Sequence, residues 1–82
     1  MTSAAKALQL IELGQWDLAH NLVQDKSDKI SCLIHAYLHR EEGDKGNAAY
    51  WYRRANEEFP QNSLTDELER LYELVNARVV PT

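Results

Sequence analysis

Residues 43–60, GDKGNAAYWYRRANEEFP, constrain the fold more than any other stretch of the chain. A glycine opens this stretch and a proline closes it, which favours a helix that begins after a turn and stops at Pro60. At 3.6 residues per turn, one face of that helix carries small and aromatic side chains: Ala48, Ala55, Trp51, Tyr52 and Phe59. Because alanine lets a neighbouring backbone approach closely, this face predicts a close crossing with a helix over residues 30–42.

The composition favours one small globular domain, residues 1–82. A chain of 82 residues is near the lower size limit for a core without disulfides or metals, and its 44% of hydrophobic residues is ordinary for a globular protein. The formal net charge of −4 disfavours long-range attraction to nucleic acid or to an anionic membrane, so we expect neither as a partner. The single cysteine, Cys32, excludes a disulfide within the chain and a metal site built from cysteines.

No stretch is hydrophobic over the length of a signal peptide or of a transmembrane helix. The N-terminal residues, MTSAAKALQ, are short of such a run. We therefore expect a cytoplasmic protein.

Hydrophobic periodicity predicts an all-α fold with five helices, at about residues 3–13, 15–24, 28–42, 45–59 and 63–79. Three serines are predicted to cap them, namely Ser3 for the first helix, Ser27 for the third and Ser63 for the fifth. Gly14 is predicted to end the first helix in the left-handed conformation. The third helix is apolar on two opposite sides, which indicates a position between two neighbours.

The faces of the other helices are also predicted. The first is expected to bury Ala4, Ala7, Leu8 and Ile11, and the second Leu18, Ala19, Leu22 and Val23. The outer face of the fourth carries Tyr50, Arg53, Arg54 and Glu57, and its i,i+4 spacing predicts ion pairs of Arg53 with Glu57 and of Arg54 with Glu58. The fifth shows a stripe of Leu64, Leu68, Leu71, Tyr72, Val75 and Val79, with Asp66, Glu69, Arg70 and Glu73 facing water.

The first two helices repeat in the next two. Gly14 aligns with Gly43, 29 residues later, and the same offset aligns Ala7 with Ala36 and Ala19 with Ala48. Each unit therefore reads as helix, glycine turn, helix, with a small residue on either side of the turn. Similarity of helix pairs at a fixed period is typical of a solenoid.

Several residues of the second unit stand at the spacings of a known repeat: Ala36, Gly43, Ala48, Tyr52, Ala55 and Pro60. On these residues the unit resembles the tetratricopeptide and Sel1-like repeat families, and AAYWYRRA (residues 48–55) is similar to the second helix of a Sel1-like repeat. The resemblance covers roughly residues 4–60. In the first unit Lys26 takes the place of Ala55 and no proline closes the unit, and the offset is shorter than the tetratricopeptide period of about 34 residues.

The resemblance implies a TPR-like α-solenoid fragment: a right-handed stack of two antiparallel helix hairpins, repeat one over about residues 3–26 and repeat two over about 27–60, with a capping helix over about 63–79. Such families are interaction scaffolds in which the first helix of each pair lines a groove. Carried over to this chain, the groove residues are Leu8, Leu33, Tyr37 and Arg40. The Lys and Asn residues with which some tetratricopeptide domains bind a peptide carboxylate are absent at the matching positions.

We therefore expect a non-enzymatic protein–protein interaction module that binds a protein or peptide, with a second copy of the chain as the alternative partner. Tyr50 and Arg53 on the outer face of the fourth helix join the groove residues as candidate contacts. The sequence contains no G-x-S-x-G, no P-loop and no paired Cys/His nucleophile, so we expect neither enzymatic activity nor a cofactor.

Two alternatives follow from particular residues. His35 and His39, four residues apart on one helix face, could bind a small ligand, or a metal with Glu42 or His20 as a third ligand, although histidines that are merely structural fit the pattern better. Tyr50, Arg53 and Arg54 could bind nucleic acid by stacking and phosphate contacts, which the net negative charge disfavours.

Overall fold

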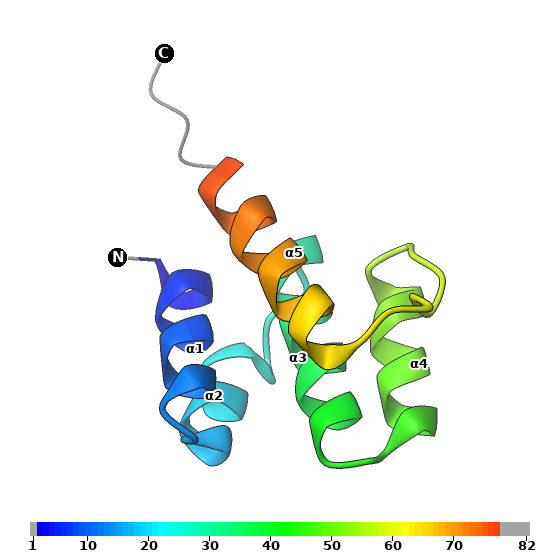
Figure 1. The fold of residues 1–82 in the computed structure, drawn as a ribbon, viewed down its shortest axis with the longest axis horizontal. Coiled ribbons are helices and arrows are strands. Elements are labelled where there is room, and N and C mark those ends of the chain that lie inside the picture. The colour runs from blue at the N-terminus through cyan, green and yellow to red at the C-terminus, as the bar shows by residue number, and fades with distance from the viewer. Residues whose placement is uncertain (1, 78–82) are drawn as a thin grey trace.

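The computed structural model describes residues 2–77, which form five helices and no strand. The helices are α1 (Ser3–Glu12), α2 (Trp16–Val23), α3 (Lys29–Glu41), α4 (Lys45–Arg54) and α5 (Leu64–Ala77). α1 and α2 form one hairpin, α3 and α4 form a second, and α5 packs against α3 and α1 (Figure 1). The prediction of an all-α chain is confirmed for this part of the sequence.

α3 occupies the centre of the molecule. It contacts each of the other four helices, and every one of its residues from 30 to 39 is buried. This confirms that the third helix lies between neighbours, as its two apolar sides predicted. Within residues 2–77, no helix has both the length and the apolar character needed to cross a bilayer.

The two hairpins turn at glycines in the left-handed conformation. Gly14 has φ +74° and Gly43 has φ +87°. Just after each glycine an amide donates to a carbonyl five residues back, Gln15 to Leu10 at 2.9 Å and Asp44 to His39 at 2.8 Å, which is the Schellman pattern. The predicted glycine turns are therefore confirmed, and they repeat at the offset of 29 residues seen in the sequence.

The alanines at the helix crossings are all buried. Ala7, Ala19, Ala36 and Ala48 are fully inaccessible to solvent, and Ala55 is 3% exposed. A side chain of one methyl group leaves room for the neighbouring backbone, which is why these positions are closely packed. The predicted inward face of the fourth helix is confirmed at Ala48, Ala55 and the fully buried Tyr52, whereas Phe59 lies beyond the end of α4.

Two predicted helix caps are wrong and one is confirmed. Thr2, not Ser3, caps α1 by accepting from the Ala5 amide at 3.1 Å, and Asp28, not Ser27, caps α3 by accepting from the Ser31 amide at 3.1 Å. In each case the residue three positions before a free amide is the cap. Ser63 accepts from the Asp66 amide at 3.0 Å, as predicted.

The prediction that the fourth helix continues to Phe59 and stops at Pro60 is wrong. α4 ends at Arg54 because Asn56 takes the left-handed conformation (φ 62°) and the Glu57 amide donates to the Tyr52 carbonyl at 3.0 Å. Asparagine tolerates this conformation better than most residues and can replace glycine after a helix. Glu57 and Glu58 therefore lie outside the helix, and the helical geometry that the predicted Arg53–Glu57 and Arg54–Glu58 ion pairs require is absent.

Glu57 instead joins the second hairpin to α5. One carboxylate oxygen lies 3.1 Å from Arg70 Nη2 and the other 3.4 Å from Lys29 Nζ. Arg70 is half-buried rather than in open water, which corrects the face predicted for it. Leu18 is also misplaced by the prediction, since it is 51% exposed while Ala19 and Val23 form the buried face of the short helix α2. Val79 lies outside the described residues.

Candidate functional site: a histidine and tryptophan layer beneath the outer face of α4

Three helices bring together all three histidines and both tryptophans of the chain. Trp16 opens α2 and His20 follows one turn later, His35 and His39 lie one turn apart on α3, and Trp51 comes from α4. The i,i+4 spacing in α2 and in α3 puts each pair on one helix face. The layer is therefore assembled by the packing of α2 and α4 on the central helix.

The rings of this layer contact one another closely. Trp51 stacks on His35 with 3.8 Å between ring centroids, and Trp16 stacks on His20 at 4.8 Å. Between these two stacks His35 lies 4.9 Å from His39 and meets His20 edge to face at 4.6 Å. The three imidazoles therefore lie between two indoles.

Two polar atoms of the layer bond to groups outside it, and one buried polar atom has no partner among the described residues. The Trp16 indole Nε1 donates to the Leu38 carbonyl at 2.8 Å, and His39 Nδ1 lies 2.7 Å from a carboxylate oxygen of Glu42. His35 Nδ1 is buried and has no hydrogen-bond partner among the described residues. An unpaired buried nitrogen is uncommon in a folded protein, since it has given up its hydration without replacement.

Burial keeps two of the imidazoles in their neutral form. It lowers the pKa of His35 to about 4, and the nearby His20, His39 and Arg54 side chains lower it further in the same direction. Burial also lowers the pKa of His20, with His39 contributing. At pH 7 both rings are uncharged, which is the form that binds a metal ion or packs in an apolar interior.

Of the two proposed third ligands, the structure brings His20 close to both His35 and His39, and Glu42 close to His39 alone. One ring nitrogen from each of His20, His35 and His39 lies within 4.8 Å of the other two. Glu42 is hydrogen-bonded to His39 instead, and a second group of ligand atoms at the same spacing consists of His39, Glu42 and Asp44. Of the two candidates named from the sequence, His20 is the one that completes a group with both predicted histidines.

The solvent side of the layer is formed by the outer face of α4. Arg53 and Arg54 are exposed and Tyr50 is 44% exposed, as the sequence predicted. The Arg54 guanidinium lies over two rings, 4.9 Å from the Trp51 centroid and 5.9 Å from that of Tyr50. An arginine and two rings are thus arranged side by side at the surface, supported from below by His35.

The predicted groove residues lie elsewhere. Leu8, Leu33 and Tyr37 are in the core, exposed by 0%, 1% and 4%, and α5 packs on the helices that carry them. Arg40 is half-buried and donates to the Tyr52 hydroxyl at 3.2 Å and to Asn62 at 2.9 Å and 2.6 Å. Of the six candidate contact residues, Tyr50 and Arg53 are the ones that the structure leaves exposed.

Glu67 of α5, which is not among the residues predicted from the sequence, is completely buried. Its carboxylate accepts from the Tyr52 hydroxyl at 2.8 Å, from Asn62 at 3.0 Å and from Arg70 through two bonds of 2.8 and 2.9 Å. Burial alone would raise the pKa of Glu67, but the hydrogen bonds from Arg70, Asn62 and Tyr52 outweigh it and lower the pKa. Its position could have indicated this burial, since residue 67 falls between Leu64 and Leu71 on the apolar face predicted for the fifth helix.

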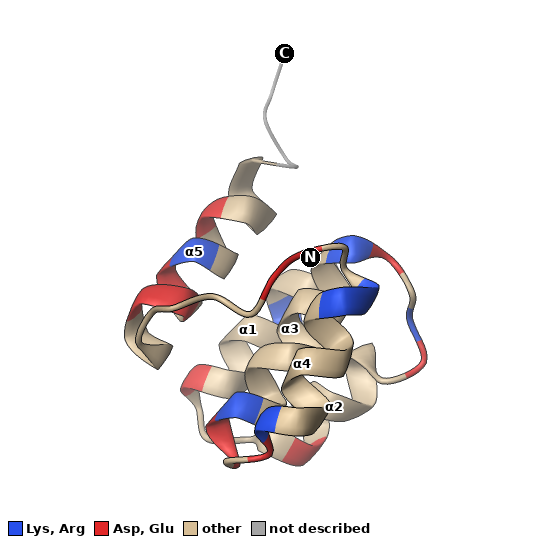
Figure 2. Ribbon diagram, turned by 90° about the vertical axis from the view of Figure 1, so that its right-hand side faces the viewer, with Lys and Arg blue, Asp and Glu red and all other residues tan. Residues whose placement is uncertain are grey.

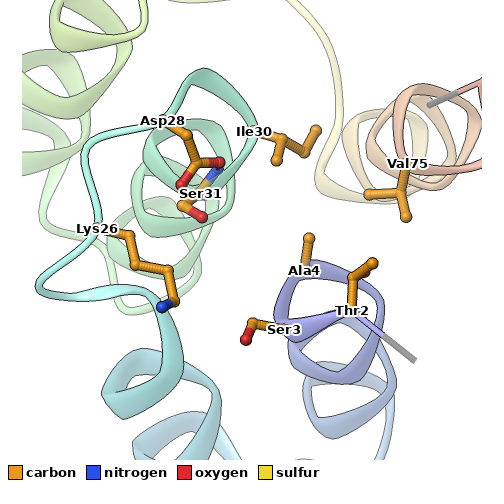
Figure 3. Close-up of a pocket in the computed structure, with 8 residues that line it drawn as sticks. All are labelled: Thr2, Ser3, Ala4, Lys26, Asp28, Ile30, Ser31 and Val75. Carbon is orange, nitrogen blue, oxygen red and sulfur yellow. The ribbon is translucent and has the colours of Figure 1, made fainter.

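A cavity of about 320 Å³ lies at the other end of the molecule, between the starts of α1 and α3 (Figure 3). Thr2 and Asp28 line it, but both already cap the amides of their own helices. Lys26 is exposed at its edge. Because its capping groups are used within the fold, this cavity has no feature that points to a ligand.

The comparisons with known proteins found no match: no protein-family model, no curated protein and no solved structure is similar to this chain. The resemblance to tetratricopeptide and Sel1-like repeats therefore has no support beyond the residues that suggested it.

Proposed function

We propose that the protein is a non-enzymatic interaction module that binds an acidic segment of a partner protein through the outer face of α4. One observation carries this proposal, namely the position of the Arg54 guanidinium over both Tyr50 and Trp51 at the surface. Arginine, tyrosine and tryptophan are the residues that contribute most often to the binding energy of protein interfaces.

The surroundings of Trp51 support the same proposal. Its ring is fixed by stacking on His35 at 3.8 Å, and α4 itself packs on the central helix. Side chains that are already ordered lose little conformational entropy on binding, so more of the contact energy becomes affinity. The TPR-like arrangement of two hairpins and a capping helix forms part of this proposal, with the contact surface moved from the groove to α4.

The charge of this face favours an acidic partner. Arg53 and Arg54 are adjacent and exposed in a chain whose net charge is −4. Elsewhere in residues 2–77, basic residues are dispersed among acidic ones and do not form a stripe along one side of the molecule (Figure 2). A short acidic segment is complementary to such a local patch, whereas nucleic acid requires a more extended one.

Site-specific photo-crosslinking in cells that express the protein tests the proposal. A photoreactive residue in place of Tyr50 should yield a discrete protein adduct, and the same residue in place of Glu69, exposed on α5, should not. Adding Arg54→Ala to the first variant should reduce the adduct roughly tenfold without changing the melting temperature. Equal adducts from both positions, or an adduct with nucleic acid, would contradict the proposal.

A further inference from the structure

We propose that His20, His35 and His39 form a binding site for one divalent transition-metal ion of the zinc, nickel, cobalt or copper class. This inference does not depend on the interaction proposed for α4. Four features of the layer carry it: the convergence of three ring nitrogens, the unpaired nitrogen of His35, the carboxylate on His39 and the chemistry of the ligand set.

The three ring nitrogens are close to the separation that a metal requires. They lie within 4.8 Å of one another. Nitrogens bound tetrahedrally at metal–nitrogen distances of 2.0–2.1 Å are ~3.4 Å apart, so metal binding requires the group to contract by at most ~1.4 Å. His20 is half-buried and comes from α2, whereas His35 and His39 are buried on the central helix, so we expect the His20 ring to rotate when the site closes.

The unpaired nitrogen of His35 points to a ligand. The side chain is 3% exposed, and its Nδ1 has no partner among the described residues. A phenylalanine would pack against Trp51 without this unsatisfied atom, so stacking alone does not account for a histidine here. A metal ion coordinated by that nitrogen would supply the missing interaction.

Glu42 supplies the third feature, a carboxylate that supports a metal ligand. Its carboxylate lies 2.7 Å from His39 Nδ1, which keeps that nitrogen occupied and leaves Nε2 as the atom that coordinates. Metal-binding histidines commonly donate their other ring N–H to a carboxylate, which fixes the ring and raises its basicity.

The ligand set limits the class of metal. Three neutral imidazoles suit zinc, copper, nickel and cobalt, whereas magnesium and calcium require oxygen ligands. Three protein ligands also leave one coordination position for water or for a group from another molecule.

Titration of zinc into the metal-free full-length protein tests this inference. Because the chain has only three histidines, nitrogen NMR of the imidazoles follows every ring directly. All three rings should change together and saturate at one zinc per chain, and the melting temperature should rise with free zinc. A change confined to His20, saturation at another ratio, or no change at excess zinc would overturn the proposal and leave the histidines a packing role.

Two variants separate metal binding from folding. Glu42→Gln should weaken zinc binding by about 10- to 100-fold. Its matched control is Glu41→Gln, which alters the neighbouring exposed carboxylate and should leave zinc binding unchanged. His20→Gln should weaken binding at least tenfold while melting like the wild type without zinc. Equal zinc affinity in wild type and Glu42→Gln would also count against the site, and none of these results bears on the crosslink at Tyr50.

Discussion

Single residues in this fold combine burial with charge. Glu67 is the clearest case, since a fully buried carboxylate is stabilised by donors from Tyr52, Asn62 and Arg70. A charge in the interior is costly unless its partners are all present, so the loss of any one member of this network should destabilise the fold. His35 differs, because burial and its neighbours His20, His39 and Arg54 all lower its pKa and none opposes the others.

Replacement of Glu67 by alanine should lower the free energy of unfolding by about 3–5 kcal/mol. The substitution leaves the buried Tyr52 hydroxyl without its acceptor and Arg70 without two hydrogen bonds. Urea denaturation measures the change. Glu69→Ala, on the exposed side of the same helix, is the control and should cost less than about 0.5 kcal/mol. Similar values for the two variants would contradict the role assigned to the network.

Acid should destabilise the metal-free protein through His35. Its pKa is about 4 in the folded chain against an ordinary value of 6.5, so the unfolded chain binds the proton more readily. The stabilisation is complete above pH 6.5 and is lost as the pH falls towards 4, by about 3 kcal/mol. His20, with its pKa also lowered, acts in the same direction.

Denaturation curves between pH 7 and 4, recorded with a chelator, measure this loss. The variant His35→Phe keeps a ring against Trp51 but cannot be protonated, and it retains every carboxylate that also titrates in acid. Its stability should therefore decrease less over this range than that of the wild type. An equal decrease would show that His35 is not responsible.

Three helices, α1, α3 and α4, end where the backbone becomes left-handed, and the residue at that point determines how well the end can be predicted from the sequence. Gly14 and Gly43 were recognisable because glycine adopts this conformation freely. Asn56 does the same but is less specific for it, so the proline four residues later was wrongly predicted to end α4. The alanines at the crossings were predictable from spacing alone, because helical periodicity fixes their face.

Alanine substitutions at the three glycines should have opposite effects. Gly14→Ala and Gly43→Ala should each cost about 1 kcal/mol, because the left-handed conformation is strained for a residue with a Cβ even though nothing lies within 4 Å of it. Gly46→Ala is the control within helix α4. Its Cβ also meets open space, so this substitution should stabilise the protein by up to about 1 kcal/mol. Thermal melting of the three variants measures these effects. Destabilisation by all three would contradict the expected difference between the turn glycines and Gly46.

For the molecule as a whole, α5 completes a core that two hairpins leave open. It packs on α3 and α1, buries Leu71 and Val75, and donates a hydrogen bond from Tyr72 to Glu12 at the end of α1. Two helix-pair repeats are fewer than a solenoid usually needs. The sequence suggested this role for the last helix, but the meeting of His20 with His35 and His39, and of Glu67 with Tyr52, depends on tertiary packing that local periodicity does not encode.

Removal of residues 64–82 should abolish cooperative unfolding, because Leu8, Leu33 and Tyr37 would lose their cover on the α5 side. Circular dichroism on heating should show a gradual loss of helix in place of a sharp transition. As a milder test in the full chain, Leu71→Ala should cost about 2–5 kcal/mol. Leu64→Ala, at a position 36% exposed, should cost much less. A sharp transition in the truncated chain would refute the role of α5.

Both tryptophans of the protein lie in one layer, each with its indole against an imidazole. Tryptophan fluorescence, excited selectively over that of tyrosine, therefore originates where α2 and α4 meet the central helix, and none of it comes from α5. Detachment of α5 would therefore change the tryptophan fluorescence little, while circular dichroism would record the lost helix. Divergence between the two optical probes during unfolding would identify which part of the molecule opens first.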